Sequence, residues 1–167
     1  MMITDDALLQ SIAAELGEQL VSRKMRLATA ESCTGGWVAK IITDLDGSSR
    51  WFECALVTYH NEAKQALLGV DEQILKDYGA VSQPTVKAMV LGLLDRCNAN
   101  IGVSISGVAG PGGGTDEKPV GTVWMAWARP GRVLEAVRYT FDGDREQVRR
   151  QAVYQALLGV KRLLDNG

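Results

Sequence analysis

Apolar residues recur along the chain with both helical and strand-like spacing, and their alternation predicts an α/β domain. Helical spacing is seen at 5–22, 33–43, 61–70, 71–77, 82–97 and 144–164. Strand-like runs lie at 26–30, 55–59, 101–107, 122–128 and 133–141, the last two forming a hairpin around "RPGR". Strands that alternate with helices favour a three-layer α/β/α sandwich, and the late hairpin makes its sheet mixed but mostly parallel.

Turn and capping residues refine this pattern and indicate where a site would form. Asp5, Asn61 and Ser82 are residues that commonly begin helices. In open α/β sheets, ligands bind beyond the carboxyl ends of the strands. The side chains at or near three of those predicted ends are polar: Ser32, Tyr59 and Ser106. We therefore expect three separated segments to share one site.

Composition narrows the class of protein without identifying it. The chain has 167 residues, 46% of them hydrophobic, and a net charge of −2, so we expect one domain over residues 1–167 and no nucleic-acid partner. The N-terminus lacks the pattern of a signal peptide and no run is long enough to cross a membrane, so a cytoplasmic protein is expected. Three cysteines without a CxxC pair and a single histidine favour neither a disulfide framework nor a metal site.

The segment "ATAESCTGGWVAK" at 28–40 offers two roles for Ser32, helix cap or nucleophile. Serine between a strand and a helix commonly caps the helix, which stabilises it by about 1 kcal/mol. Gly35 and Gly36 are costly in a first helical turn, but they would let a ligand approach the N–H groups around Thr34. Cys33 is an alternative nucleophile, because a thiol at a helix N-terminus can have a depressed pKa; a small buried thiol is the other interpretation.

The segment "VTYHNEAK" supplies candidate groups for proton transfer. Tyr59 and Lys64 could act as a pair, although a lone lysine on a helix is usually solvated and a lone tyrosine usually packs. His60 is the alternative base, since an unperturbed imidazole is largely neutral at pH 7. Neighbouring strand residues point to opposite faces, so Tyr59 and His60 cannot both face the site unless the strand has ended. The proton acceptor stays open among these three residues.

Two further segments could bind an anion. "SISGVAGPGGGTDEKPVGT" is rich in glycine, including Gly112 and Gly113, and can turn several N–H groups toward a ligand, but it lacks the Walker A register. A flexible surface connection is the alternative. Arg145 lies in the first turn of the last predicted helix, where it opposes the helix dipole, so it is either incidental surface or placed to meet an anion.

Five segments in order resemble the CinA C-terminal domain family. They are "TAESCTGG", "VTYHNEAK", "GAVS", "SISGVAGPGGGTDEKPVGTV" and "GDREQVRRQAV", and the resemblance extends from about residue 5 to residue 165. The length of the chain is similar to that of the family's stand-alone nicotinamide-nucleotide amidases. The resemblance implies an α/β/α domain that hydrolyses the carboxamide of nicotinamide mononucleotide to nicotinate mononucleotide and ammonia, in pyridine nucleotide salvage, without a metal or other cofactor.

The resemblance also implies roles for particular residues. The nucleophile falls on Ser32, the assisting tyrosine and lysine on Tyr59 and Lys64, and two polar positions of the substrate site on Ser106 and Arg145. His60 departs from the family, which often has serine there. The substrate phosphate could meet the glycine loop or Arg145. The alternatives are a non-catalytic nucleotide-binding regulatory module and an amidase for another small amide. For a small cytosolic enzyme, a homodimer or higher homo-oligomer is the default expectation.

Overall fold

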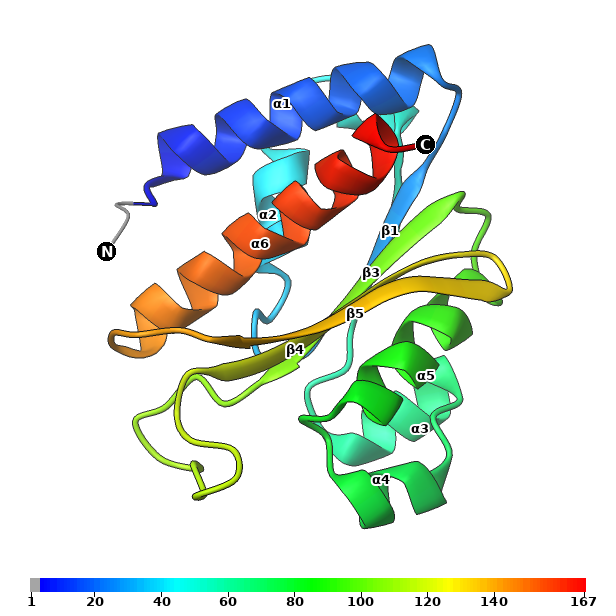
Figure 1. The fold of residues 1–167 in the computed structure, drawn as a ribbon. Helices are drawn as coiled ribbons and strands as arrows, with labels where there is room; N and C mark the ends of the chain where they lie inside the picture. The colour runs from blue at the N-terminus through cyan, green and yellow to red at the C-terminus, as the bar shows by residue number, and fades with distance from the viewer. Residues whose placement is uncertain (1–3) are drawn as a thin grey trace.

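A five-stranded mixed sheet forms the centre of the computed structural model, which describes residues 4–167 (Figure 1). Its strands run in the order β2-β1-β3-β4-β5, with bounds β1 Leu27–Glu31, β2 Phe52–Val57, β3 Ile101–Gly107, β4 Thr122–Arg129 and β5 Arg132–Thr140. β1 pairs in parallel with β2 and β3, whereas β4 pairs antiparallel with β3 and β5. Four strands therefore point one way and only β4 opposes them. The predicted fold class is confirmed; residues 1–3 of the predicted domain lie outside the described residues.

Helices cover both faces of the sheet and complete the three layers (Figure 1). One face packs against α1 Asp6–Ser22, α2 Trp37–Thr43 and α6 Arg145–Asp165. The other packs mainly against α5 Gln83–Leu94, and α3 Asn61–Leu68 and α4 Glu72–Tyr78 pack on α5. A short 3-10 turn, Ser48–Arg50, precedes β2. Two hydrophobic cores result, one on each side of the sheet.

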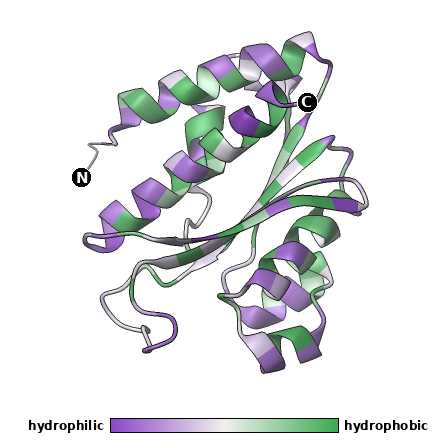
Figure 2. Cartoon of the chain, in the orientation of Figure 1, coloured by the Kyte–Doolittle hydropathy of each residue, from purple (hydrophilic) through white to green (hydrophobic). Residues whose placement is uncertain are grey.

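The central strands are apolar because both of their faces are covered. All five residues of β1 are buried, as are six of the seven in β3, and Figure 2 colours both strands mainly green. The edge strand β2 is only half-buried, and β5 is half-buried over residues 133–137 with exposed residues toward its ends. Full burial of one large aliphatic side chain stabilises a fold by about 1.5–3 kcal/mol, so Leu27, Ile101 and Ile105 favour the middle of the sheet for these two strands.

The helix starts agree with the sequence pattern in part. Asp5 and Ser82 cap α1 and α5 through their side chains, as predicted. α3 begins at Asn61, as predicted, and the cap position before it is held by His60, whose side chain makes no capping hydrogen bond. The helix predicted over 33–43 begins only at Trp37, so Ser32 is not its cap.

The carboxyl ends of β1, β2 and β3 meet at one edge of the sheet, as their parallel pairing requires. β5 points the same way, so the connection to α6 returns to this edge as well. This edge is where the candidate residues from separate segments can approach one another. No helix among residues 4–167 has the length and apolar character needed to cross a membrane.

Candidate active site

Ser32 and Lys64 lie in direct contact at this edge of the sheet. Lys64 Nζ is 3.0 Å from Ser32 Oγ, although the residues come from segments after different strands. Ser32 follows β1 and extends its pairing, because its N–H donates to the Ile105 carbonyl. Lys64 projects from α3. The pair is thus held by the sheet on one side and by a helix on the other.

Burial makes Lys64 an unusual lysine. Only 1% of its surface is exposed, and this burial lowers its pKa to about 8, because a charged ammonium is poorly solvated there. Besides contacting Ser32, its Nζ donates to the carbonyls of Thr58 at 2.7 Å and Tyr59 at 3.3 Å. A neutral amine has two N–H groups and one lone pair. The two carbonyls can orient the N–H groups, which directs the lone pair at Ser32 Oγ.

The pair opens into a pocket of about 230 Å³. Its lining brings together five residues predicted or considered from the sequence: Ser32, Cys33, Tyr59, Ser106 and Arg145, with Lys64 beneath them. Ser106 is almost fully buried at the end of β3. Short residues of neighbouring connections complete the wall: Ala80, Val81, Gly107 and Ala109. A small polar group of a ligand, such as a carboxamide, can reach Ser32 here.

Tyr59 lies at the mouth of the pocket rather than between Ser32 and Lys64. β2 has ended two residues earlier, and 61% of Tyr59 is exposed. Its hydroxyl accepts a hydrogen bond from Arg145 at 3.0 Å, and Arg145 also donates to the Gly110 carbonyl at 2.8 Å. Arg145 therefore joins the segment after β2 to the glycine-rich loop.

A buried carboxylate that the sequence analysis missed organises the turn after Ser32. Glu31 is fully buried and accepts hydrogen bonds from the N–H groups of Val38 and Ala39 and from the Thr34 hydroxyl. It therefore satisfies N–H groups in the first turn of α2, which follows the N–H groups around Thr34 that are expected to meet a ligand. The available signal was an acidic side chain at the end of a strand just before a helix.

The two glycines of this segment serve the turn itself. Gly35 and Gly36 have φ values of +59° and +94°, in the left-handed region where glycine is favoured. The N–H of Gly35 donates to the Ser32 carbonyl and closes the turn. With Thr34, they line a separate surface depression beside Trp37 and Arg149, and not the Ser32 pocket.

Arg149 fixes the peptide groups that follow Ser32. It lies one helical turn after Arg145 and donates to the carbonyls of Cys33 and Thr34 at 2.9 and 3.1 Å. The carbonyl and N–H of a trans peptide point in opposite directions. In the described part of the chain, the N–H groups of Cys33 and Thr34 have no acceptor. The spacing of four from Arg145 was the signal that could have identified Arg149.

Gly112 and Gly113 lie away from the pocket. Both are exposed, and neither is part of its lining. The glycine-rich loop reaches the site through its first residues instead: Gly107 and Ala109 in the wall, and the Gly110 carbonyl that holds Arg145. The residues of the loop nearest β3, and not Gly112 or Gly113, therefore contribute to the pocket.

The alternative nucleophile and base occupy environments unsuited to those roles. Burial raises the pKa of Cys33 to about 12, so its thiol stays protonated near neutral pH. The side chain of His60 is 78% exposed, lies beside Glu62 and is outside the pocket lining. Within residues 4–167, no group of three or more His, Cys, Asp or Glu side chains is arranged to hold a metal ion.

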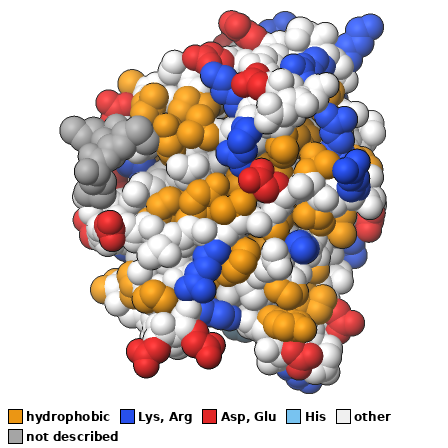
Figure 3. Space-filling model, viewed as in Figure 1, with side chains coloured by type: hydrophobic (Ala, Val, Ile, Leu, Met, Phe, Trp, Pro, Cys, Tyr) orange, Lys and Arg blue, Asp and Glu red, His pale blue; other side chains and the backbone are white. Residues whose placement is uncertain are grey.

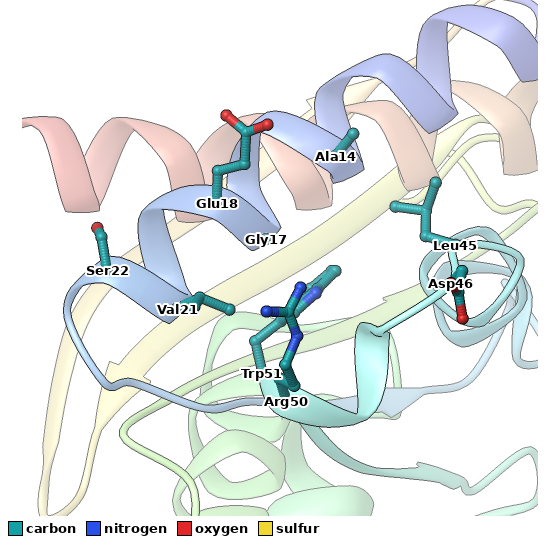
Figure 4. Close-up of a pocket in the computed structure, with 9 residues that line it drawn as sticks. All are labelled: Ala14, Gly17, Glu18, Val21, Ser22, Leu45, Asp46, Arg50 and Trp51. Carbon is teal, nitrogen blue, oxygen red and sulfur yellow. The ribbon is translucent and has the colours of Figure 1, made fainter.

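A roomier pocket of about 440 Å³ lies at the opposite edge of the sheet, between α1 and the segment that precedes β2 (Figure 4). Trp51 forms its floor and packs so closely on Gly17 that a Cβ there would approach the indole within 2.7 Å. Arg50, Glu18 and Asp46 surround it. It contains no contacting nucleophile and base, so the smaller pocket is the better candidate for catalysis.

Comparison with known proteins shows the family of the chain. The model of the CinA C-terminal domain matches residues 9–164. "Nicotinamide-nucleotide amidohydrolase PncC" of Escherichia coli (strain K12) is 52% identical over 155 residues, which cover 93% of each chain. The protein of the same name from Pseudomonas putida is 51% identical, over 92% of this chain and 95% of its own. The crystal structure of competence damage-inducible protein A from Klebsiella pneumoniae is 38% identical and superposes with a TM-score of 0.89, over 93% of this chain and 96% of that one. The chain belongs to the CinA C-terminal domain family.

Proposed function

We propose that the protein hydrolyses the carboxamide of nicotinamide mononucleotide to nicotinate mononucleotide and ammonia, with Ser32 as nucleophile and Lys64 as base. The 3.0 Å contact between Lys64 Nζ and Ser32 Oγ carries the proposal. Two relatives that match more than nine-tenths of this chain are named nicotinamide-nucleotide amidohydrolase, which supports this substrate. The pocket accepts a small planar amide, and its wall carries the polar groups Ser106 and Arg145.

The reaction begins with proton transfer from Ser32 to neutral Lys64. The lowered pKa of about 8 leaves a useful fraction of the amine neutral near pH 7. Ser32 Oγ then attacks the carboxamide carbon and forms a tetrahedral intermediate. The negative charge develops on the former carbonyl oxygen. This step places the oxyanion beside the turn that follows Ser32.

The N–H of Cys33 is the donor that we assign to the oxyanion. It belongs to the residue after the nucleophile, it has no acceptor among the described residues, and Cys33 lines the pocket. The Ser106 hydroxyl lines the same pocket and can help to orient the carboxamide. Arg149 acts as a positioning residue, because it holds the carbonyls of Cys33 and Thr34, in the two peptide groups that directly follow the one carrying the Cys33 N–H.

Collapse of the intermediate releases ammonia. The proton held by Lys64 passes to the departing nitrogen as the carbon–nitrogen bond breaks, which leaves an ester on Ser32 and a neutral amine. Lys64 then takes a proton from water, whose oxygen attacks the ester carbon. As the bond to Ser32 Oγ breaks, Lys64 returns this proton to Oγ, which frees the carboxylate and restores the neutral amine. Tyr59 contacts Arg145 and not Ser32, so we place it at the mouth of the pocket as a substrate-positioning group.

Ammonia release from nicotinamide mononucleotide tests this function. Ser32→Ala should lower kcat by at least about 100-fold, since it removes the nucleophile while the fold, checked by circular dichroism, stays intact. Cys33→Ala should retain most of the activity, because the thiol is buried and protonated. The serine assignment fails if Ser32→Ala keeps full activity or if Cys33→Ala is the inactive variant. Release from simple amides but not from the mononucleotide would contradict the proposed substrate.

A further inference from the structure

A second pocket adjoins the Ser32 pocket and is not used by the mechanism above. It has a volume of about 620 Å³ and shares Val81 with the first pocket. It lies between the α4–α5 connection and the far end of the glycine-rich loop, over β4 and β5. Its lining includes Asp77, Glu117, Lys118, Trp124 and Arg138.

A row of paired residues across the sheet connects the two pockets. Ser106 in β3 pairs with Trp124 in β4, and Trp124 pairs with Arg138 in β5. Directly paired residues have their side chains on the same face of a sheet, here the face that α5 covers. Neighbouring strands are about 4.8 Å apart, so the row extends about 10 Å from the first pocket, a span comparable to a mononucleotide. A ligand with its amide at Ser32 can therefore extend over Trp124 toward Arg138.

Two cations at the end of this row retain unused hydrogen-bonding capacity. Lys118 donates to the Tyr78 carbonyl at 2.5 Å, and Arg138 donates to the Glu117 carbonyl at 2.7 Å. Neither forms a salt bridge within the described residues 4–167. Backbone carbonyls fix the two side chains without neutralising their charge, and most of the five guanidinium donors remain free. Figure 3 shows basic side chains at the surface between the glycine-rich loop and the α3–α5 layer.

The turn that carries Lys118 is itself ordered by hydrogen bonds. The N–H of Lys118 donates to the Thr115 hydroxyl, and the N–H of Thr115 donates to the Lys118 carbonyl. Across the pocket, Gly79 has a φ of +75°, and a Cβ there would lie 3.2 Å from Lys118 Nζ. Glycine at this position leaves room for the ammonium group.

The acidic residues of the pocket favour a sugar phosphate over a simple anion as its ligand. Asp77 and Glu117 line the same pocket as the two cations, so its formal charge is balanced. A bare phosphate gains nothing from nearby carboxylates. A sugar phosphate offers hydroxyl donors that carboxylates accept and an anionic group that Lys118 and Arg138 can bind.

We propose that this second pocket binds the ribose phosphate of the substrate, with Arg138 and Lys118 on the phosphate. The proposal rests on the proposed amidase function and adds the subsite that selects a phosphorylated substrate. It places the phosphate away from both Arg145 and the N–H groups of the glycine-rich loop. Arg145 then remains with Tyr59 at the mouth of the first pocket.

Kinetics with nicotinamide mononucleotide and its riboside, which lacks the phosphate, test this subsite. Arg138→Gln and Lys118→Gln should each raise KM for the mononucleotide by about 10- to 100-fold, the range expected for a lost charged hydrogen bond. Values of kcat and the kinetics of the riboside should change little. Arg132→Gln is the matched control, because Arg132 is exposed on the same strand and outside this pocket.

Two results would overturn the subsite. One is an unchanged preference for the mononucleotide in both variants, and the other is loss of that preference in Arg145→Gln alone. Direct binding separates this proposal from the amidase function: ribose 5-phosphate should bind the wild type and bind Arg138→Gln at least about tenfold more weakly by calorimetry. If the wild type hydrolyses neither substrate yet shows this difference, the amidase function fails and the subsite stands. If ribose 5-phosphate does not bind the wild type, the subsite fails.

Discussion

At the scale of single residues, one buried amine explains how a site without a contacting histidine can activate serine. The buried Lys64 lacks the water that stabilises the charge of an ordinary lysine, and the carbonyls of Thr58 and Tyr59 replace some of the lost hydrogen bonds to water. Desolvation and nearby carbonyl oxygens oppose one another: burial favours the neutral amine, whereas carbonyl oxygens favour the ammonium. Burial dominates, because the pKa falls to about 8.

The pH dependence of the reaction follows from this shift. Because neutral Lys64 is the form that accepts the Ser32 proton, kcat/KM should rise about tenfold per pH unit below the pKa of about 8 and level off above it. His60→Gln is the control and should leave the inflection in place. An inflection that disappears in this variant would instead identify His60 as the base.

The same shift affects stability. The pKa of Lys64 is lower in the folded chain than its ordinary value of 10.5, so between about 8 and 10.5 the unfolded state binds more protons. The contribution of Lys64 to the free energy of unfolding therefore rises with pH across this window and is smallest below it, where the buried ammonium is charged.

The sequence predicts which residues form the site better than it predicts the hydrogen bonds between them. The residues Ser32, Lys64, Ser106 and Arg145 were predicted to share a site, and the fold brings them to one pocket. The partner of Tyr59 could not be predicted, since Arg145 lies 86 residues away and reaches it only through the return of α6. The roles of Glu31 and Arg149 were missed because both act on backbone groups of a turn whose geometry depends on left-handed glycines.

At the scale of elements, a close helix contact sets the position of the base. α3 carries Lys64, and its last residue, Leu68, lies against Gly92 of α5. A Cβ at Gly92 would come within 1.8 Å of the Leu68 carbonyl oxygen, so a larger residue must separate the two helices. The position of Lys64 relative to Ser32 thus depends on a glycine that touches neither.

Gly92→Ala should lower both stability and activity. Alanine favours a helix by about 1 kcal/mol over glycine, but overpacking against backbone typically costs about 1–3 kcal/mol and here meets a fixed carbonyl. We expect a net loss near 2 kcal/mol, a fall in Tm of about 4–8 °C by calorimetry, and a lower kcat as α3 shifts. Gly112→Ala is the control, because nothing lies within 4 Å of its added Cβ. A Gly92→Ala protein with unchanged Tm and kcat would show that α3 does not depend on this contact.

Periodicity predicted the elements well where local forces decide them. The capping side chains of Asp5 and Ser82, and the apolar runs of β1 and β3, are local signals that the fold retains. The start of α2 was wrong by four residues, since Gly35 and Gly36 adopt φ values that no periodic pattern reports.

At the scale of the whole molecule, the direction of the strands assembles the site. β1, β2 and β3 end at one edge, α6 begins there, and residues from five segments line one pocket. Nothing in a local pattern specifies which strands are neighbours; the order β2-β1-β3 is a property of tertiary packing. That order places the segment after β1 next to those after β2 and β3, so Ser32 can meet both Lys64 and Ser106.

Mass spectrometry of the protein quenched during turnover of nicotinamide mononucleotide tests this assembly most directly. The mechanism predicts an acyl adduct with the mass of the nicotinoyl nucleotide, located by peptide mapping on Ser32, absent from Ser32→Ala and formed much more slowly in Lys64→Met. An adduct on Cys33, or ammonia released at the wild-type rate by Ser32→Ala without any adduct, would contradict it.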